Sequence, residues 1–187
     1  MSVIRNNKKL VALMLTLALT ISMAVPVLAA VEPRSTLPVF YVGRAIRIKS
    51  YASPDLYLTA PTMASNYRVY ALPKNYTDNQ VWKISYYTSP NHNEYLLKMY
   101  SNQNICMNIA GDNGCLVYSV TAGTVEDKVI RFADEGNDKF GIILVRHNPM
   151  VAITLSNVRY SSGYRAEWQV GGAAGQQNNQ FWLFETT

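Results

Sequence analysis

The chain has 187 residues, 49% of them hydrophobic, and a formal net charge of +5, a composition that excludes an intrinsically disordered tail. Three of the positive charges lie in the first nine residues, so the chain from residue 31 onward has 14 Lys and Arg against 12 Asp and Glu. Because the positive and negative side chains of this part nearly cancel, it lacks the strong positive charge that nucleic-acid binding needs. We therefore expect no nucleic acid as a partner.

The first 30 residues have the pattern of a secretory signal peptide. A basic start precedes the apolar stretch Leu10–Val27, and small residues follow at Ala29 and Ala30. The sequence therefore predicts cleavage near residue 30 and a secreted, extracellular product. The alternative is an uncleaved membrane anchor, which Pro26 and the small residues disfavour, and no later segment is long or apolar enough to span a membrane.

Residues 31–40 contain two prolines and are predicted to form an extended leader into one domain at 41–187. Short strands are predicted in that domain from alternating or apolar runs at 44–49, 81–84, 95–99 and 140–145. Turn clusters separate them at 53–55, 89–91, 110–114, 161–163 and 171–175. Because no capped amphipathic helix follows residue 40, the pattern indicates an all-β sandwich or barrel.

The domain contains an internal repeat. Three related blocks end at Trp82, Ile130 and Trp182, which are 48 and 52 residues apart. Three β-rich units of this size, with nothing to cap an open stack, predict a closed arrangement with pseudo-threefold symmetry.

Asn79–Trp82 and Asn179–Trp182 each carry a Gln-x-Trp motif near the end of a block. Cys106–Ile109, followed by the pair Asn113 and Gly114, is similar to a Cys-Leu-Asp-Val segment with its Asn-Gly. Over about residues 41–187 these motifs resemble the ricin B-type lectins. The resemblance implies a β-trefoil with three pseudo-repeats after the cleaved signal peptide. The repeats are expected at about 41–90, 91–136 and 137–187.

The resemblance also implies one shallow sugar pocket in each repeat, built from an Asp, an aromatic residue and an Asn. No repeat keeps that Asp. The positions that correspond are Thr59, Tyr70 and Asn79 in the first repeat, Asn108, Tyr118 and Asp127 in the second, and Trp168 and Asn179 in the third. We expect the second repeat to be the main site, because the tight turn at 110–114 would hold Asn108 and Tyr118 close together. Trp168 follows a polar stretch and is expected to be exposed.

Several of these residues have a structural interpretation as well. Gln80, Trp82, Gln180 and Trp182 are expected to be scaffold, with indoles filling the core and amides satisfying backbone groups. Tyr70 and Tyr118 are equally consistent with core rings, and Asn108 with a turn-shaping role. Cys106 and Cys115 predict a short-loop disulfide in a secreted chain, with two buried free thiols as the alternative.

The sequence contains no enzyme signature, and we expect no catalytic residue, metal or cofactor. His92 and His147 have no second ligand at metal spacing, and the acidic cluster Asp134, Glu135 and Asp138 is typical of a solvated turn rather than a glycosidase pair. The sequence thus predicts a secreted, non-enzymatic protein that binds glycans or glycoproteins. The alternative is a trefoil without sugar binding that acts on a separate protein partner, as an inhibitor or as a component of a secreted complex.

Overall fold

The structure is a computed structural model, and it describes residues 39–88, 93–144, 146–171 and 177–187. The predicted signal peptide, most of the predicted leader and the turn at 89–91 lie outside these residues. Within the described ranges, no helix has the length and apolar character needed to cross a membrane.

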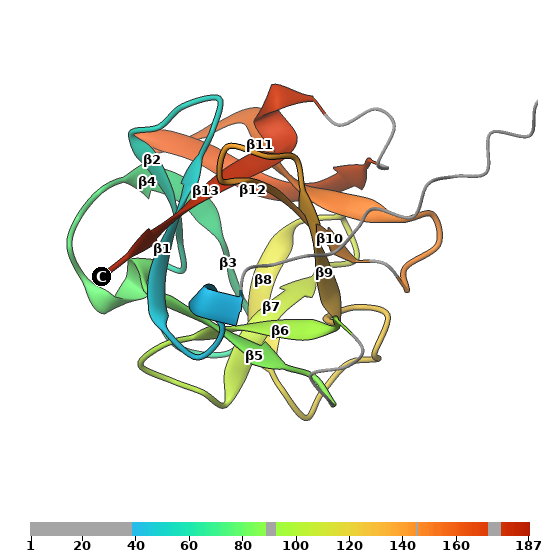
Figure 1. The fold of residues 1–187 in the computed structure, drawn as a ribbon. Coiled ribbons are helices and arrows are strands. Elements are labelled where there is room, and N and C mark those ends of the chain that lie inside the picture. The colour runs from blue at the N-terminus through green and yellow to red at the C-terminus, as the bar shows by residue number, and fades with distance from the viewer. Residues whose placement is uncertain (1–38, 89–92, 145, 172–176) are drawn as a thin grey trace, which may run out of the picture. The chain divides into compact units, whose positions relative to one another are not determined.

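Strands make up most of the described chain (Figure 1). They are β1 Ala45–Ser50, β2 Leu56–Thr59, β3 Tyr67–Arg68, β4 Tyr70–Pro73, β5 Trp82–Tyr86, β6 Tyr95–Met99, β7 Ile105–Ile109, β8 Cys115–Ser119, β9 Ile130–Asp134, β10 Lys139–Leu144, β11 Val151–Tyr160, β12 Gly163–Val170 and β13 Phe181–Thr186. Short 3-10 helices lie at Val39–Tyr41, Asp78–Gln80 and Asn178–Gln180. The four predicted strands correspond to β1, β5, β6 and β10.

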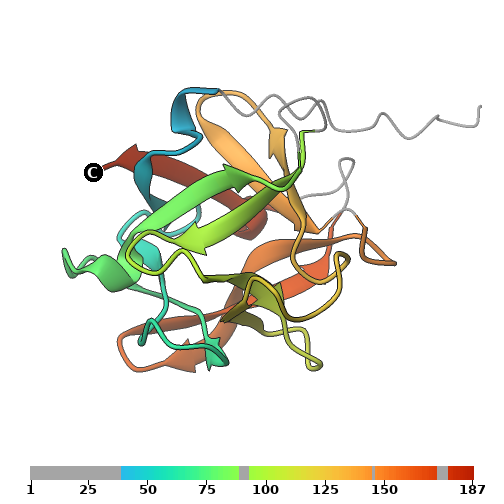
Figure 2. The ribbon, with the colours of Figure 1, turned by 90° about the horizontal axis from the view of Figure 1, so that it is seen from below.

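Six strands close into a barrel. The antiparallel pairs run from β1 to β5, β6, β9, β10 and β13, and β13 pairs with β1 again. Closure removes the open edges that a flat sheet of six strands would expose. β5 and β6 lie side by side in the view from below (Figure 2).

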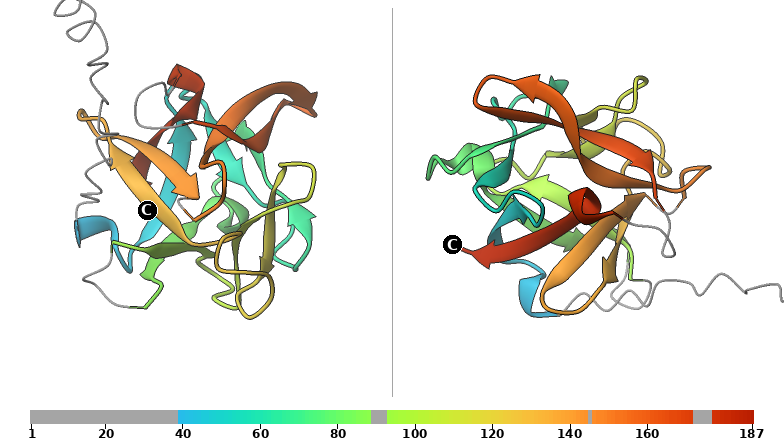
Figure 3. Two further views of the ribbon diagram at one scale, coloured as in Figure 1. Left: turned by 90° about the vertical axis from the view of Figure 1, so that its right-hand side faces the viewer. Right: turned by 90° about the horizontal axis from the view of Figure 1, so that it is seen from above.

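Each repeat adds one hairpin-like pair beside its two barrel strands: β2 with β4, β7 with β8, and β11 with β12. β12 also pairs with β4, and β3 with β8, so the three pairs are joined to one another. The long β11–β12 pair is seen in orange and red tones in Figure 3. A six-stranded barrel with three such pairs is a β-trefoil, as the sequence predicted.

Buried and partly exposed residues alternate along β1, so one face of the strand points into the core. Ile46 and Ile48 of β1 are fully buried, while Arg47 and Lys49 between and beyond them face outward. Aromatic rings fill much of the interior. Phe140 and Phe184 stack with centroids 4.7 Å apart, and the edge of the Phe132 ring meets Phe184 at 5.6 Å. Tyr41 packs edge-on against Phe184, at 5.3 Å.

The predicted disulfide between Cys106 and Cys115 is wrong, because both cysteines are free and buried. In the β7–β8 register Cys106 lies opposite Tyr118, and Cys115 lies opposite Ile109. Opposite residues share a face and neighbours along a strand alternate, so the two thiols point to opposite sides of the pair. Cys115 packs in the main core, whereas Cys106 packs with Leu96 and Val129 outside it.

Two unreactive thiols are therefore expected in the folded protein. Burial raises the pKa of the Cys106 thiol to about 11 and raises that of Cys115 as well, which suppresses the reactive thiolate. Intact-mass analysis with a thiol reagent at pH 8 should show no label on the native chain. It should show two labels in guanidinium without any reductant. Labelling that needs prior reduction would mean that a disulfide exists.

Candidate functional site

The two Gln-x-Trp glutamines hold backbone groups inside the fold. The amide nitrogen of Gln80 donates to the carbonyl of Pro73 at 2.9 Å and to the hydroxyl of Thr59 at 2.9 Å. Gln180 donates to the equivalent hydroxyl of Thr154 at 3.1 Å. Both glutamines are buried, so their amides serve the scaffold and have no surface to offer a ligand.

The indoles at the repeat ends have an equivalent arrangement. Trp82 donates its N–H to the carbonyl of Leu58, and Trp182 to that of Ile153, each at 2.9 Å. Both rings are fully buried. Each bond connects a barrel strand to the hairpin strand of its own repeat.

In the second repeat, different residues stand at the positions of these glutamines and indoles. Lys128 stands where the other repeats have Gln, is only 6% exposed, and donates to the carbonyls of Val120 and Ala122 at 2.9 and 2.8 Å. Ile130 stands where they have Trp. The third indole, Trp168 of β12, donates to the carbonyl of Asn108 on β7 at 3.0 Å, one residue beyond the position that corresponds to Leu58 and Ile153.

Two of the predicted sugar contacts are therefore corrected. Trp168 is fully buried, not exposed, and its N–H, on a strand of the third repeat, is bonded to the backbone of the second. Asn108 is 4% exposed, and its Oδ1 accepts from the backbone N–H of Ile109 at 2.8 Å. It lies at the position that Thr59 and Thr154 occupy in the other repeats, so it faces the scaffold and not solvent.

The first repeat does not bring its predicted residues together in an open pocket. Thr59 is fully buried, and the ring of Tyr70 stacks on Tyr160 with centroids 3.7 Å apart. The side-chain oxygen of Asn79 accepts hydrogen bonds from its own loop, from Asn75 at 3.1 Å and from Thr77 at 2.5 Å.

In the third repeat Asn179 is partly buried and donates to the carbonyl of Leu155 at 3.4 Å. Its Oδ1 is buried without a hydrogen-bond partner among the described residues. Tyr118 of the second repeat is half-exposed on β8, opposite Cys106.

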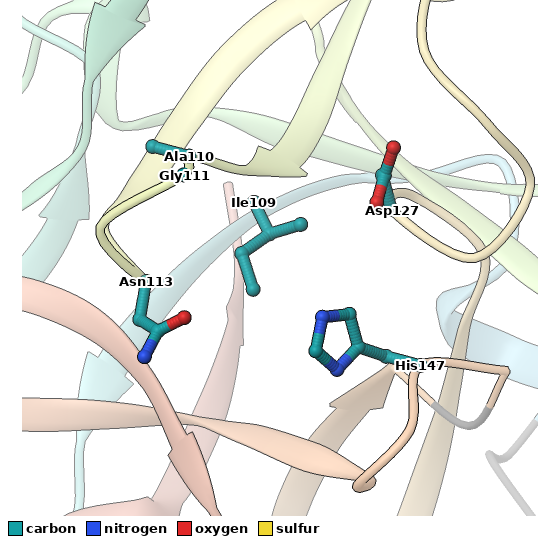
Figure 4. Close-up of a pocket in the computed structure, with 6 residues that line it drawn as sticks. All are labelled: Ile109, Ala110, Gly111, Asn113, Asp127 and His147. Carbon is teal, nitrogen blue, oxygen red and sulfur yellow. The ribbon is translucent and has the colours of Figure 1, made fainter.

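One pocket does form at the second repeat, an open hollow of about 290 Å³ (Figure 4). It is lined by Ile109, Ala110, Gly111, Asn113, Asp127 and His147. The first four come from the end of β7 and the turn to β8, Asp127 precedes β9, and His147 follows β10. Of the predicted sugar-binding residues, only Asp127 lines it.

The turn that carries Asn113 is held firmly. Asn113 has a positive φ of 62°, a conformation that Asn tolerates better than most residues, and its N–H donates to the carbonyl of Ala110 at 2.9 Å. Its own carbonyl accepts from the backbone N–H of Trp168 at 2.6 Å. The buried strand β12 thereby positions the turn, and the side-chain amide of Asn113 faces the pocket (Figure 4).

The carboxylate of Asp127 and the ring of His147 have defined orientations. Asp127 accepts from the N–H and hydroxyl of Thr124 at 3.1 and 2.9 Å, both through Oδ2. His147 Nδ1 lies 2.9 Å from the carbonyl of Pro149. Since a carbonyl only accepts, Nδ1 carries a proton, and Nε2 of the neutral ring is left as an acceptor.

Ion pairs to the buried carboxylate of Glu94 anchor the segment that carries His147. The neighbouring Arg146 donates to the two oxygens of Glu94 at 3.1 and 2.7 Å, and Arg131 lies 3.5 Å from the same carboxylate. Burial of Glu94 acts to raise its pKa, but the hydrogen bonds and charges of Arg146 and Arg131 outweigh burial and hold the pKa below its usual range.

The pocket combines groups that recognise a hydroxyl-rich ligand. A carboxylate accepts paired hydroxyl donors, an amide both donates and accepts, and an imidazole adds a further polar atom. The Ile109 side chain, between these groups in Figure 4, supplies apolar surface. No group of three or more His, Cys, Asp or Glu side chains suited to a metal ion is found among the described residues.

Sequence reasoning missed Asn113, His147 and Lys128 as parts of this region. In the sequence, the Asn-Gly pair at 113–114 is a signal for the family and not for a ligand contact. The sequence offers His147 only as a possible metal ligand, and no second ligand lies at metal spacing. The acidic cluster Asp134, Glu135 and Asp138 lies exposed in the β9–β10 connection, where Asp134 accepts from the N–H of Gly136 at 2.8 Å.

No protein-family model matches the chain, and no curated protein sequence matches it. Solved structures do match. The BEL β-trefoil is 17% identical, with a TM-score of 0.58 over 78% of this chain and 94% of that chain. The ricin B-like lectin of Macrolepiota procera in complex with lactose is 14% identical, with a TM-score of 0.58 over 78% of this chain and 97% of that one.

An exo-β-1,3-galactanase from Clostridium thermocellum is 13% identical, with a TM-score of 0.61 over 77% of this chain but only 30% of that one. At these identities the likeness shows the fold alone. The chain has the β-trefoil fold that ricin B-like lectins also have, which confirms the expected architecture.

Replacing Lys128 with Met should lower the free energy of unfolding by about 1–3 kcal/mol, because two partly buried carbonyls lose their donor. Lys128→Gln should recover part of this loss, since Gln80 and Gln180 fill the same role in the other repeats. Urea denaturation measures both. Lys98→Met, at a half-exposed lysine, is the control and should not destabilise; an equal loss there would contradict the assignment.

Replacing Glu94 with Gln should destabilise the protein by about 1–3 kcal/mol at pH 7, because two arginines lose their buried partner. The folded-state pKa of Glu94 is lowered, so its contribution is present above the unfolded pKa and is lost as the pH falls through the folded value. Urea denaturation should therefore show a smaller difference from wild type at pH 3 than at pH 7. Glu135→Gln, at an exposed carboxylate, should have little effect at either pH.

Proposed function

We propose that the protein is a secreted, non-enzymatic, carbohydrate-binding protein that recognises glycans or glycoproteins through the pocket of its second repeat. The observation that carries the proposal is the convergence of Asn113, Asp127 and His147 around the apolar side chain of Ile109. This is the combination that a sugar ring needs, with hydrogen-bonding groups for its hydroxyls and apolar surface for its C–H face. The signal-peptide pattern of the first 30 residues supports secretion.

The pocket suits a terminal sugar better than a long buried oligosaccharide. Its volume of about 290 Å³ is at the lower end for small-molecule sites, and it is open to solvent. No Tyr, Trp or Phe of the described residues lines it, so the apolar contacts that these residues offer are the imidazole of His147 and the side chain of Ile109. We therefore expect weak binding at this one site, and useful strength on cell or matrix glycans through multivalent display.

A glycan-array screen of the purified protein should give hits that soluble forms of the same sugar compete away. Titration by calorimetry should then show that Asp127→Ala weakens the best hit by about tenfold or more, since hydrogen bonds to charged groups contribute about 1.5–3 kcal/mol. His147→Ala should weaken it by about two- to tenfold, since hydrogen bonds to neutral groups contribute about 0.5–1.5 kcal/mol. Each variant needs an unchanged circular dichroism spectrum and urea midpoint.

Asn79→Ala is the matched control, because Asn79 holds in the first repeat the position that Asp127 holds in the second. Its affinity should stay within twofold of wild type. Loss of binding in Asn79→Ala alone would move the site to the first repeat. A blank array with folded protein would reject the glycan proposal and favour a protein partner.

A further inference from the structure

Positive side chains line the outer wall of the barrel on three adjacent strands. Arg47 and Lys49 project outward from β1, Lys83 from β5 and Lys98 from β6, and each is partly exposed while its strand neighbours are buried. β1 pairs with β5 at Ala45 and Lys83, and β5 pairs with β6 at Lys83 and Lys98. We call these four residues the cationic stripe; the strands that carry Lys83 and Lys98 are seen in Figure 2.

The protein's own carboxylates offset the stripe only in part, through the electrostatic interaction of Glu185 with Lys49. The ion pairs within the described ranges involve Arg68, Lys74, Arg131 and Arg146, and none includes a residue of the stripe. Glu185 lies opposite Arg47 in the β1–β13 register, but its carboxylate accepts hydrogen bonds from Lys74 and from the Tyr57 hydroxyl.

Two of these charges face each other directly. Lys83 and Lys98 are cross-strand partners, an arrangement that destabilises a sheet when the charges are alike. A bound anion at this place would remove the repulsion.

The charge of the domain is also unevenly distributed. Residues 39–187 contain 13 Lys and Arg and 11 Asp and Glu. Four of the 13 form the stripe, so the rest of that segment has nine positive and 11 negative side chains. The stripe is thus a local positive surface on a domain that is otherwise slightly acidic.

An exposed ring stands at the Arg47 end of the stripe. Tyr76 is 76% exposed, and the guanidinium carbon of Arg47 lies 5.9 Å from its ring centre. An exposed ring beside a row of cations suits a sugar ring that carries acidic groups, and two more exposed rings, Tyr51 and Tyr100, lie two residues beyond Lys49 and Lys98 in the chain. Unpaired nucleic acid also stacks its bases on exposed rings, so single-stranded DNA is the competing ligand to test.

We propose that the cationic stripe binds an acidic polysaccharide, a chain whose sugars carry carboxylate or sulfate groups. Alternate residues along a strand are spaced by about 6.5 Å and neighbouring strands by about 4.8 Å, so the four cations face a polymer with several charges in succession. The stripe shares no residue with the pocket of the second repeat. The proposal therefore stands apart from the function assigned to that pocket.

The test uses the purified protein with three fluorescent polymers: dextran sulfate, polygalacturonate and uncharged dextran. Anisotropy titrations should show binding to at least one acidic polymer and none to dextran, with affinity falling as salt rises. Binding to dextran sulfate alone identifies sulfate as the required group, and binding to polygalacturonate shows that a carboxylate suffices.

The double variant Lys83→Gln with Lys98→Gln should bind about tenfold or more weakly at low salt. The slope of log affinity against log salt should fall by about two, about one for each cation removed. Its urea midpoint should equal or exceed that of wild type, because the like-charge pair is gone. The matched control is Arg159→Gln with Arg165→Gln, which removes two exposed cations from β11 and β12 and should keep affinity within about twofold.

Asp127→Ala should bind the acidic polymers like wild type, which separates this site from the pocket of the second repeat. Three results would overturn the proposal. They are no binding to either acidic polymer, an equal loss in the control double variant, and equal affinity for a single-stranded DNA of the same total charge.

Discussion

A buried indole needs an acceptor for its N–H, and this requirement organises the whole trefoil. Three indoles lie fully inside the fold, and each donates to the carbonyl of a hairpin strand in a different repeat: Leu58, Asn108 and Ile153. The bonds of Trp82 and Trp182 each fix a hairpin strand to a barrel strand of the same repeat. The bond of Trp168 instead joins the hairpin strands β12 and β7, and so connects the third repeat to the second.

The second repeat shows how far the residues can change while the trefoil persists. Lys128 stands in place of a glutamine and Ile130 in place of a tryptophan, while Trp168 of the third repeat bonds to the second repeat at Asn108. Trp168 also affects the protein surface. The backbone N–H of Trp168 bonds to Asn113, so the strand that completes the core of the second repeat also positions the turn that lines its pocket.

The pocket depends in the same way on contacts between repeats. Asp127 and the turn at Asn113 belong to the second repeat, whereas His147 belongs to the third and is held in place by the Glu94–Arg146 pair. The pocket and the cationic stripe lie on different elements, one at the β7–β8 turn and the other on the outward faces of β1, β5 and β6. A polymer with neutral and acidic parts would find separate contacts on the same domain.

The sequence by itself determined the fold class, because alternating runs, turn clusters and the spacing of Trp82, Ile130 and Trp182 are local or periodic features. It also identified Gln80, Trp82, Gln180 and Trp182 as candidates for the scaffold, since a motif repeated in register points to a shared structural role. Only the tertiary structure decided which polar and aromatic residues are exposed. Trp168 is buried because β12 packs against Asn108 and the turn at Asn113, Asn108 is buried because of its place on β7, and the two cysteines are kept apart by strand register. These outcomes depend on contacts between residues distant in the chain, and no local pattern in the sequence encodes them.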